Sequence, residues 1–213
     1  CAEALDFRTA VKLVEFRGQA MQEAVPAGTG AMAAIIGLDD DAVRAACREA
    51  AQGEVVEAVN FNAPGQVVIA GHAAAVARAG EACKARGAKR ALPLPVSAPS
   101  HCALMQPAAK RLAERLAGVA FQTPALPVIH NVDVQSHAGA DALRAALTAQ
   151  LHSPVRWVET VQKLASRGVT RVLELGPGKV LAGLAKRIDK NLEAVSVNDP
   201  TSLEAALGAV KPS

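Results

Sequence analysis

Two different sequence patterns meet at the stretch Leu92-Pro93-Leu94-Pro95-Val96-Ser97-Ala98-Pro99-Ser100-His101-Cys102-Ala103-Leu104-Met105. Before Ser100, apolar residues alternate and prolines interrupt them, which indicates a short extended segment. After it, apolar residues recur at helical spacing, at Leu104, Ala108, Leu112, Ala113 and Leu116. Ser100 is therefore predicted to cap a helix whose first turn holds His101. A helix N-terminus disfavours imidazolium by only ~0.3–1 kcal/mol, so this position alone leaves a catalytic and a structural role for His101 open.

Upstream of this stretch, the pattern predicts the order strand, helix, strand, strand, helix, strand. The expected elements, after an amphipathic helix over about 6–24, are a strand at 31–38, a helix from Asp39 to about 51, strands at 55–60 and 66–70, a helix at 72–86 and a strand at 89–96. Asn62-Ala63-Pro64-Gly65 joins the two middle strands, and its Pro-Gly pair suits a type II turn. This order is the ferredoxin-like pattern.

Downstream, strands and helices alternate. Strands are expected at 128–134, 171–175 and 194–197, and helices at 140–151, 155–166, 180–188 and 202–210. Such alternation favours parallel strands packed between helices, so the fold class is α/β. Gly176-Pro177-Gly178-Lys179 lacks the Ser or Thr of a phosphate loop, since Val180 follows the lysine, and is predicted to be a strand-to-helix turn.

Composition excludes several classes of protein. A net charge of +3 over 213 residues, without a clustered basic stripe, predicts no binding to nucleic acid. The apolar runs fall short of the ~20 residues of a membrane span, so no membrane association is expected. Four cysteines without paired spacing suit reduced thiols in a cytoplasmic protein and predict no zinc site. The remaining histidines, also without ligand spacing, are His72, His130, His137 and His152.

Pro99–Met105 resembles the histidine motif of malonyl-CoA:acyl carrier protein transacylases. Three more segments resemble this family in the family's order, and the similarity runs from end to end of the chain: Val14–Pro26, Asn60–Gly71 and Glu174–Leu181. The resemblance implies an α/β-hydrolase-like domain, built from residues 1–25 and 106–213, with the ferredoxin-like unit at 26–105 inserted into it.

The sequence departs from the family at the nucleophile. The family's serine lies in a Gly-His-Ser-Leu-Gly type elbow, and no Gly-x-Ser-x-Gly occurs in these 213 residues. The chain starts at Cys1, just where the family sequence would follow that elbow. We therefore expect the C-terminal part of the enzyme, with an incomplete larger domain, inactive and poorly stable by itself.

The resemblance implies roles for three residues whose structural alternatives are also open. His101 would be the general base rather than a structural histidine. Arg17 would hold the malonyl carboxylate with its parallel N–H donors rather than only laying its stem on apolar surface. The backbone carbonyl of Gln150 would accept a hydrogen bond from the base and so select its tautomer, where the alternative is an exposed cap residue.

Three further residues are expected near the substrate: Met21, Asn60 and Asn62. For the two asparagines, a structural role in the hairpin is an equal alternative. Six basic residues could dock an acidic carrier protein or be solvated charge: Lys84, Arg86, Lys89, Arg90, Lys110 and Arg111.

The implied activity is transfer of a malonyl group from malonyl-CoA to the pantetheine thiol of acyl carrier protein through an acyl-serine intermediate. No metal or redox cofactor is implied, and the full-length enzyme is expected to be a monomer. The rival class is a non-catalytic ferredoxin-like module that binds a ligand or a partner, in which His101 is structural. The missing nucleophile favours this rival, and the continuing α/β half counts against it.

Overall fold

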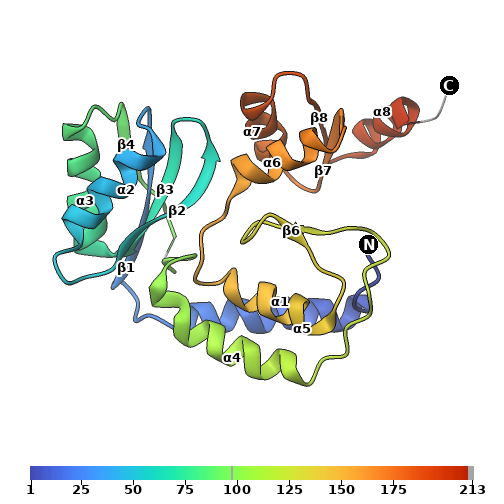
Figure 1. The fold of residues 1–213 in the computed structure, drawn as a ribbon, viewed down its shortest axis with the longest axis horizontal. Coiled ribbons are helices and arrows are strands. Elements are labelled where there is room, and N and C mark those ends of the chain that lie inside the picture. Colours follow the sequence, from blue (N-terminus) through green and yellow to red (C-terminus); the bar gives the residue numbers. More distant parts are fainter. Residues whose placement is uncertain (97, 211–213) are drawn as a thin grey trace. The chain divides into compact units, whose positions relative to one another are not determined.

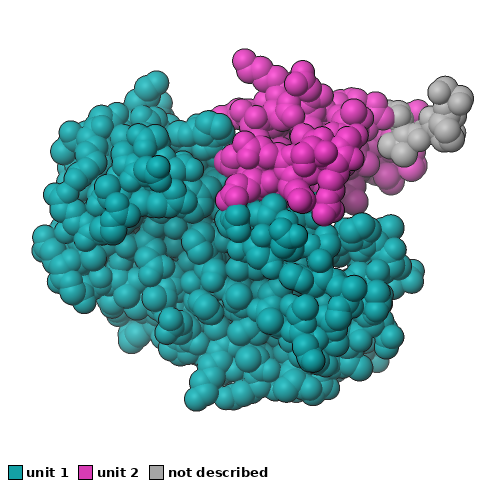
Figure 2. All heavy atoms as spheres, in the orientation of Figure 1, with its two compact units in different colours: residues 1–157 teal, residues 158–213 magenta. Residues whose placement is uncertain are grey.

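A computed structural model describes residues 1–96 and 98–210. Ser97, in the stretch from Leu92 to Met105 that we call the junction stretch, lies outside the described residues. The chain forms two compact units, Cys1–Trp157 and Val158–Ser213, which are coloured in Figure 2. The first unit contains helices and short strands in the order α1 (Phe7–Glu23), β1 (Gly30–Ile36), α2 (Asp40–Ala51), β2 (Val56–Ala63), β3 (Gln66–His72), α3 (Ala73–Ala85), β4 (Arg90–Pro93), a 3-10 turn (Ala103–Met105), α4 (Gln106–Ala117), β5 (Ile129–His130), β6 (Gln135–Ser136) and α5 (Ala140–Ala149). Helix α6 (Trp157–Ser166) follows it.

Strands β1 to β4 form one antiparallel sheet in the order β2-β3-β1-β4, and α2 and α3 cover one of its faces (Figure 1). The predicted order of six elements is therefore present. Asp39 caps α2 as predicted, with its carboxylate accepting the Ala42 N–H at 2.9 Å. Strand β4 ends at Pro93, earlier than predicted, because prolines at 93 and 95 bring no N–H to a ladder.

Aliphatic side chains from the sheet, α2 and α3 build the main core. Its most deeply buried members include Ile35, Val43, Val67 and Ile69, none of which exposes any surface. A second core joins α1 to α4 and includes Leu13, Met21, Met105, Leu112 and Leu151. The opposite face of the sheet carries a third, smaller cluster, in which Cys102 packs against Met32, Val59, Val68 and Ala70. The junction stretch thus lies on the sheet face that α2 and α3 leave free.

The helix predicted to start at Ser100 starts instead at Gln106, which corrects that expectation. His101 has a φ of 67°, which no α-helical residue adopts, and the Ser100 hydroxyl donates to the carbonyl of Ala98 at 3.4 Å instead of capping a helix. The physical reason is Pro107. A proline lacks the N–H that the interior of a helix needs, so it is tolerated only in the first turn. The field of a helix N-terminus is therefore not what acts on His101.

Two further predicted boundaries are wrong. The strand expected at 128–134 is reduced to β5, because the chain turns after His130 and pairs antiparallel with β6. The helix expected from Val155 begins at Trp157, because Val155 pairs with β2: its N–H donates to the carbonyl of Val59 at 2.8 Å, and its carbonyl accepts the N–H of Phe61 at 3.0 Å. Pairing with a distant strand outweighs the local helical pattern.

The second unit contains β7 (Arg171–Leu175), α7 (Val180–Ile188), β8 (Glu193–Val197) and α8 (Pro200–Val210). Strands β7 and β8 are parallel, as the alternating pattern predicts. Gly176-Pro177-Gly178-Lys179 forms the turn from β7 into α7, and Gly176 and Gly178 adopt φ values of 137° and 123°. Across residues 1–96 and 98–210, no helix has the length and apolar character needed to cross a membrane.

Gly71, on β3, offers a test of the four-stranded antiparallel sheet, because an added Cβ would lie 2.0 Å from the backbone oxygen of Val55. We expect Gly71→Ala to lower the free energy of unfolding by about 1–3 kcal/mol or more, since backbone cannot move aside as a flexible side chain can. The control is Gly118→Ala, where nothing lies within 4 Å of the new Cβ and the stability should be unchanged or slightly raised. Urea unfolding measures the stability of both variants. Equal stabilities would contradict the close approach of Gly71 to the backbone of Val55.

Candidate active site

The imidazole of His101 is hydrogen-bonded at Nδ1 to the backbone carbonyl of Gln150, at 2.7 Å. A carbonyl oxygen only accepts, so Nδ1 carries the hydrogen and Nε2 is left with its lone pair. Gln150 is the C-cap of α5, and its carbonyl is available because a helix leaves its last carbonyls without intrahelical donors. The structure therefore brings His101 and Gln150 together in the tautomer that a general base requires.

His101 itself sits in an unusual backbone conformation. Its φ of 67° is left-handed, which costs an ordinary L-residue about 1–2 kcal/mol. Two hydrogen bonds hold it there: the His101 N–H donates to the carbonyl of Leu151 at 3.0 Å, and the side-chain thiol of Cys102 donates to the carbonyl of Pro99 at 3.1 Å. A strained residue that its surroundings hold in place is a common property of functional sites.

The surroundings of His101 favour the neutral imidazole. Burial lowers its pKa from the ordinary value of 6.5, and the positive charge of Arg17 lowers that pKa further. The backbone hydrogen bonds to Gln150 and Ser153 act in the opposite direction, because carbonyl oxygens stabilise the protonated ring. Burial is the larger effect, so the ring is ready to accept a proton near neutral pH.

Arg17 lies half-buried on α1, and its pKa is lowered by burial. It lines a cavity of about 380 Å³ together with Gln150 and seven apolar or small residues: Leu5, Ala10, Leu13, Val14, Leu112, Leu116 and Leu147. Within residues 1–96 and 98–210, no carboxylate pairs with the Arg17 guanidinium. A partly desolvated guanidinium without an anion is suited to bind a ligand carboxylate in bidentate geometry.

The remaining predicted site residues lie elsewhere. Met21 is 9% exposed and packs in the core between α1 and α4. Asn60 and Asn62 are half-buried on β2, at the edge of the sheet where Asn60 is bridged to Val155. The structure thus brings Arg17, His101 and Gln150 together, and places the asparagines on the strand that anchors the segment following Gln150.

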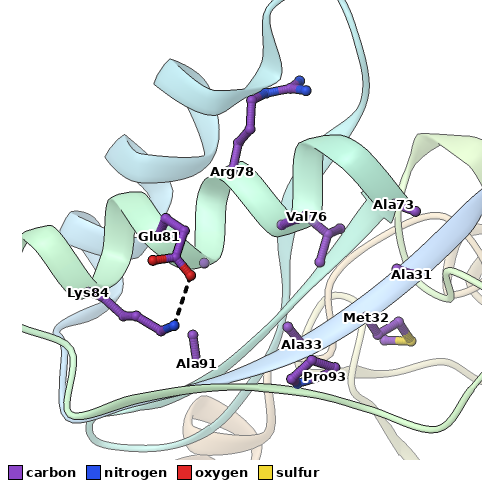
Figure 3. A pocket seen from close by; sticks show the side chains of 12 residues that line it. Ala31, Met32, Ala33, Ala73, Val76, Arg78, Glu81, Lys84, Ala91 and Pro93 are labelled. Carbon is purple, nitrogen blue, oxygen red and sulfur yellow. Dashed lines mark hydrogen bonds and ion pairs between the residues drawn. The ribbon is translucent and has the colours of Figure 1, made fainter.

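The basic residues predicted as a docking face are partly neutralised. Arg86 pairs with Glu49, Arg111 with Glu23, and Lys84 with Glu81, the last pair being visible in Figure 3. Lys84 and Glu81 lie at one end of a groove of about 660 Å³ beside α3, whose other lining residues are mostly small, such as Ala31, Ala33 and Ala91 (Figure 3). This groove contains none of the residues around His101.

Two of the histidines without ligand spacing, His72 and His137, make structural contacts. The Nδ1 atom of His72 accepts the N–H of Val55 at 2.9 Å, and Nε2 of His137 contacts the carboxylate of Asp133 at 2.7 Å. Sequence reasoning missed the contact of the Ser153 backbone with His101 and the pairing of Val155 with β2.

The family model described as "Acyl transferase domain" matches residues 1–211. The chain belongs to this acyl transferase family. Among curated acyl transferases, it is 61% identical over 207 residues to the malonyl CoA-acyl carrier protein transacylase of Escherichia coli K12, a match that covers 97% of the chain and 67% of that protein. It is 44% identical over 211 residues to the Bacillus subtilis protein of the same name, covering 99% of the chain and 67% of the relative. The chain thus spans about two thirds of the length of these acyl transferases.

Solved structures of acyl transferases support the same family assignment. An acyl carrier protein S-malonyltransferase from Vibrio cholerae superposes with a TM-score of 0.95 at 62% identity, over 97% of this chain and 67% of that one. A malonyl-transacylase in complex with a type II polyketide synthase acyl-carrier protein gives a TM-score of 0.97 at 59% identity, over 98% of this chain and 68% of that one. The mixed α/β fold of the chain is therefore that of these acyl transferases.

The pKa of His101 can be tested directly. Its imidazole should titrate below 6.5, because burial and the charge of Arg17 both disfavour the protonated ring. Arg17→Met should raise this pKa, because it removes the nearby positive charge, whereas Arg17→Lys should leave it low. NMR titration of the His101 ring in the folded protein measures all three. A midpoint that Arg17→Met leaves unchanged would show that the two side chains do not interact.

Proposed function

We propose that the chain supplies the base and the substrate clamp for transfer of a malonyl group from malonyl-CoA to the pantetheine thiol of acyl carrier protein. The observation that carries the proposal is the half-buried Arg17, free of a carboxylate partner among the described residues, within electrostatic reach of a histidine whose Nδ1 is tied to a backbone carbonyl. The name that both relatives share, malonyl CoA-acyl carrier protein transacylase, supports the same assignment.

The first half-reaction forms an acyl-serine. Serine Oγ attacks the thioester carbonyl, His101 Nε2 takes the hydroxyl proton, and the C–S bond to coenzyme A breaks. The protonated His101 then returns this proton to the departing thiolate. No Gly-x-Ser-x-Gly occurs in these 213 residues, so the serine and its oxyanion hole belong to the part of the family fold that this sequence does not include.

The second half-reaction uses the same base again. His101 takes the proton of the pantetheine thiol, the thiolate attacks the acyl-serine carbonyl, and the serine alkoxide recovers the proton from His101. The Gln150 carbonyl holds Nδ1–H throughout, which keeps Nε2 directed at whichever hydroxyl or thiol is bound. A neutral carbonyl stabilises the imidazolium less than an aspartate would, so the proton is passed on readily.

Arg17 would determine which acyl group is accepted. Malonyl and acetyl thioesters differ by one carboxylate, and a guanidinium in a partly apolar cavity gains from binding that charge while it is left unpaired by acetyl. Met21, which is in the core one helical turn from Arg17, would support the clamp from behind. Asn60 and Asn62 would act from the edge of β2.

Docking of the acidic carrier protein would draw on the basic residues without an ion-pair partner among the described residues. These are Lys89, Arg90 and Lys110, since Lys84, Arg86 and Arg111 already pair with glutamates. Complementary charge of this kind accelerates encounter more than it raises affinity. The relative solved with an acyl-carrier protein supports a partner of this class.

We further propose that residues 26–105 form a ferredoxin-like unit inserted into an α/β-hydrolase-like domain made of 1–25 and 106–213. The antiparallel strand order β2-β3-β1-β4 with two helices on one face supports the first part. The parallel β7-β8 pair supports the second. A cytoplasmic location would suit the four free cysteines.

The rival assignment, a ferredoxin-like binding module in which His101 is structural, is not favoured. The family match extends over residues 1–211, far beyond 26–105.

Arg17→Ala tests the clamp in a transacylase that joins these residues to a nucleophile segment. Loss of a desolvated charge pair costs about 2 kcal/mol or more, so malonyl transfer should fall at least ~30-fold, while acetyl transfer should not fall and should rise if the charge of Arg17 weakens the base. The measurement is kcat/KM with malonyl-CoA and with acetyl-CoA. Equal losses for the two substrates would reduce Arg17 to a structural residue.

His101→Ala tests the base in the same enzyme. Removing a general base should slow acylation by about 10²–10⁴-fold, while the far-ultraviolet circular dichroism and the melting temperature stay near those of the parent. Rapid-quench measurement of the acyl-enzyme gives the rate. A variant of normal stability that acylates at the parental rate would exclude His101 from the mechanism.

A further inference from the structure

Glu57 lies on β2 and faces the side of the sheet that carries the junction stretch. It is paired in register with Ala70, which belongs to the cluster around Cys102, whereas its neighbours Val56 and Ala58 belong to the core under α2 and α3. Residues paired directly across two strands project from the same face. Glu57 is therefore a carboxylate placed beneath the segment that carries His101.

The contacts of Glu57 gather around that segment. Its carboxylate is hydrogen-bonded to the backbone N–H of Ala103, and its charge acts on the thiol of Cys102 and is stabilised by the nearby imidazole of His152. Half burial raises the pKa of Glu57, with the Ala103 hydrogen bond and His152 acting against this. A partly buried carboxylate is retained at a cost in desolvation, which its hydrogen bond offsets.

The same strand also holds the other partner of the His101 hydrogen bond. Val155 is joined to Val59 and Phe61 of β2 by two backbone hydrogen bonds, and it follows Gln150 by five residues. Strand β2 thus holds both segments, the turn after His101 through Glu57 and the chain after Gln150 through Val155. Together with the direct hydrogen bond from the His101 N–H to the carbonyl of Leu151, strand β2 therefore helps to set the separation of His101 Nδ1 from the Gln150 carbonyl.

We propose that Glu57 is a positioning residue, which holds the turn at Ala103 so that His101 keeps its left-handed backbone and its bond to Gln150. The proposal rests on the function proposed above. Glu57 does not touch substrate; it acts through the backbone of Ala103. Without its carboxylate the Ala103 N–H loses its acceptor, the turn is free to relax, and Nε2 moves away from the reacting hydroxyl. Misplacement by about 1 Å can reduce a rate by 10²-fold.

The test compares Glu57→Ala with Glu57→Gln in a transacylase that contains these residues and the nucleophile. Glu57→Ala should lower kcat for malonyl transfer by about 10- to 100-fold at an unchanged KM for malonyl-CoA. Glu57→Gln keeps an acceptor oxygen, so it should recover kcat to within about threefold of the parent. The matched control is Glu81→Ala on α3, over the opposite face of the sheet, where the exposed Glu81–Lys84 pair can be broken without loss of activity.

A spectroscopic measurement separates this inference from the proposed function. The His101 Nδ1–H proton, bonded to a carbonyl at 2.7 Å, should resonate downfield in the parent and in Glu57→Gln, and should shift upfield or broaden in Glu57→Ala. If Glu57→Ala does not fold, Glu57→Met fills the volume without an acceptor and replaces it. An unchanged His101 resonance, or an unchanged kcat in a folded variant, overturns the inference, whereas a parent unable to transfer malonyl overturns the proposed function.

Discussion

The arrangement of the site depends on one hydrogen bond, from Nδ1 of His101 to the backbone carbonyl of Gln150. It selects the tautomer, orients the ring and joins two segments that are 49 residues apart in the sequence. Its acceptor is a carbonyl that α5 leaves unused at its end, and its donor is a residue in a left-handed conformation. Neither group could hold the other if its own segment were free to move, so the rigidity of the bond derives from what anchors these segments.

That anchoring comes from the edge strand β2. An edge strand has unpaired backbone groups that would otherwise invite unwanted pairing. Here Val155 occupies two of these groups, at Val59 and Phe61, and the chain leading from Gln150 is thereby fixed to the sheet. The opposite helix-covered face carries the aliphatic core, whose members Ile35 and Ile69 expose no surface. The sheet consequently supports His101 both through these backbone contacts and through the side-chain cluster around Cys102.

Local sequence signals predicted most elements, and they failed where long-range pairing or a single proline decides the structure. Asp39 identified the start of α2 and the Pro64-Gly65 pair identified the β2–β3 turn, because caps and turns depend on a few neighbouring atoms. The apolar spacing after Ser100 was correct for α4 but could not show that Pro107 moves its start to Gln106. The pairing of Val155 with β2 involves residues about a hundred positions apart, so periodicity could not reveal it. For the site, Arg17, His101 and Gln150 were selected through the family motifs, while the position of Glu57 on the face of the sheet next to Cys102 needed the sheet register.

Burial disfavours the charged forms of both Arg17 and His101. Each pKa is lowered by burial, and the charge of Arg17 further disfavours protonation of His101. Before substrate binds, this keeps the base neutral and prevents two positive charges from lying close together in a medium of low polarity. In the proposed reaction, a malonyl carboxylate paired with Arg17 would cancel most of that charge and so reduce the penalty on the imidazolium. The proton affinity of His101 would then rise when, as proposed, it accepts a proton from the nucleophile. Acetyl thioesters bring no carboxylate and leave the penalty in place, so the clamp would discriminate through the strength of the base as well as through binding.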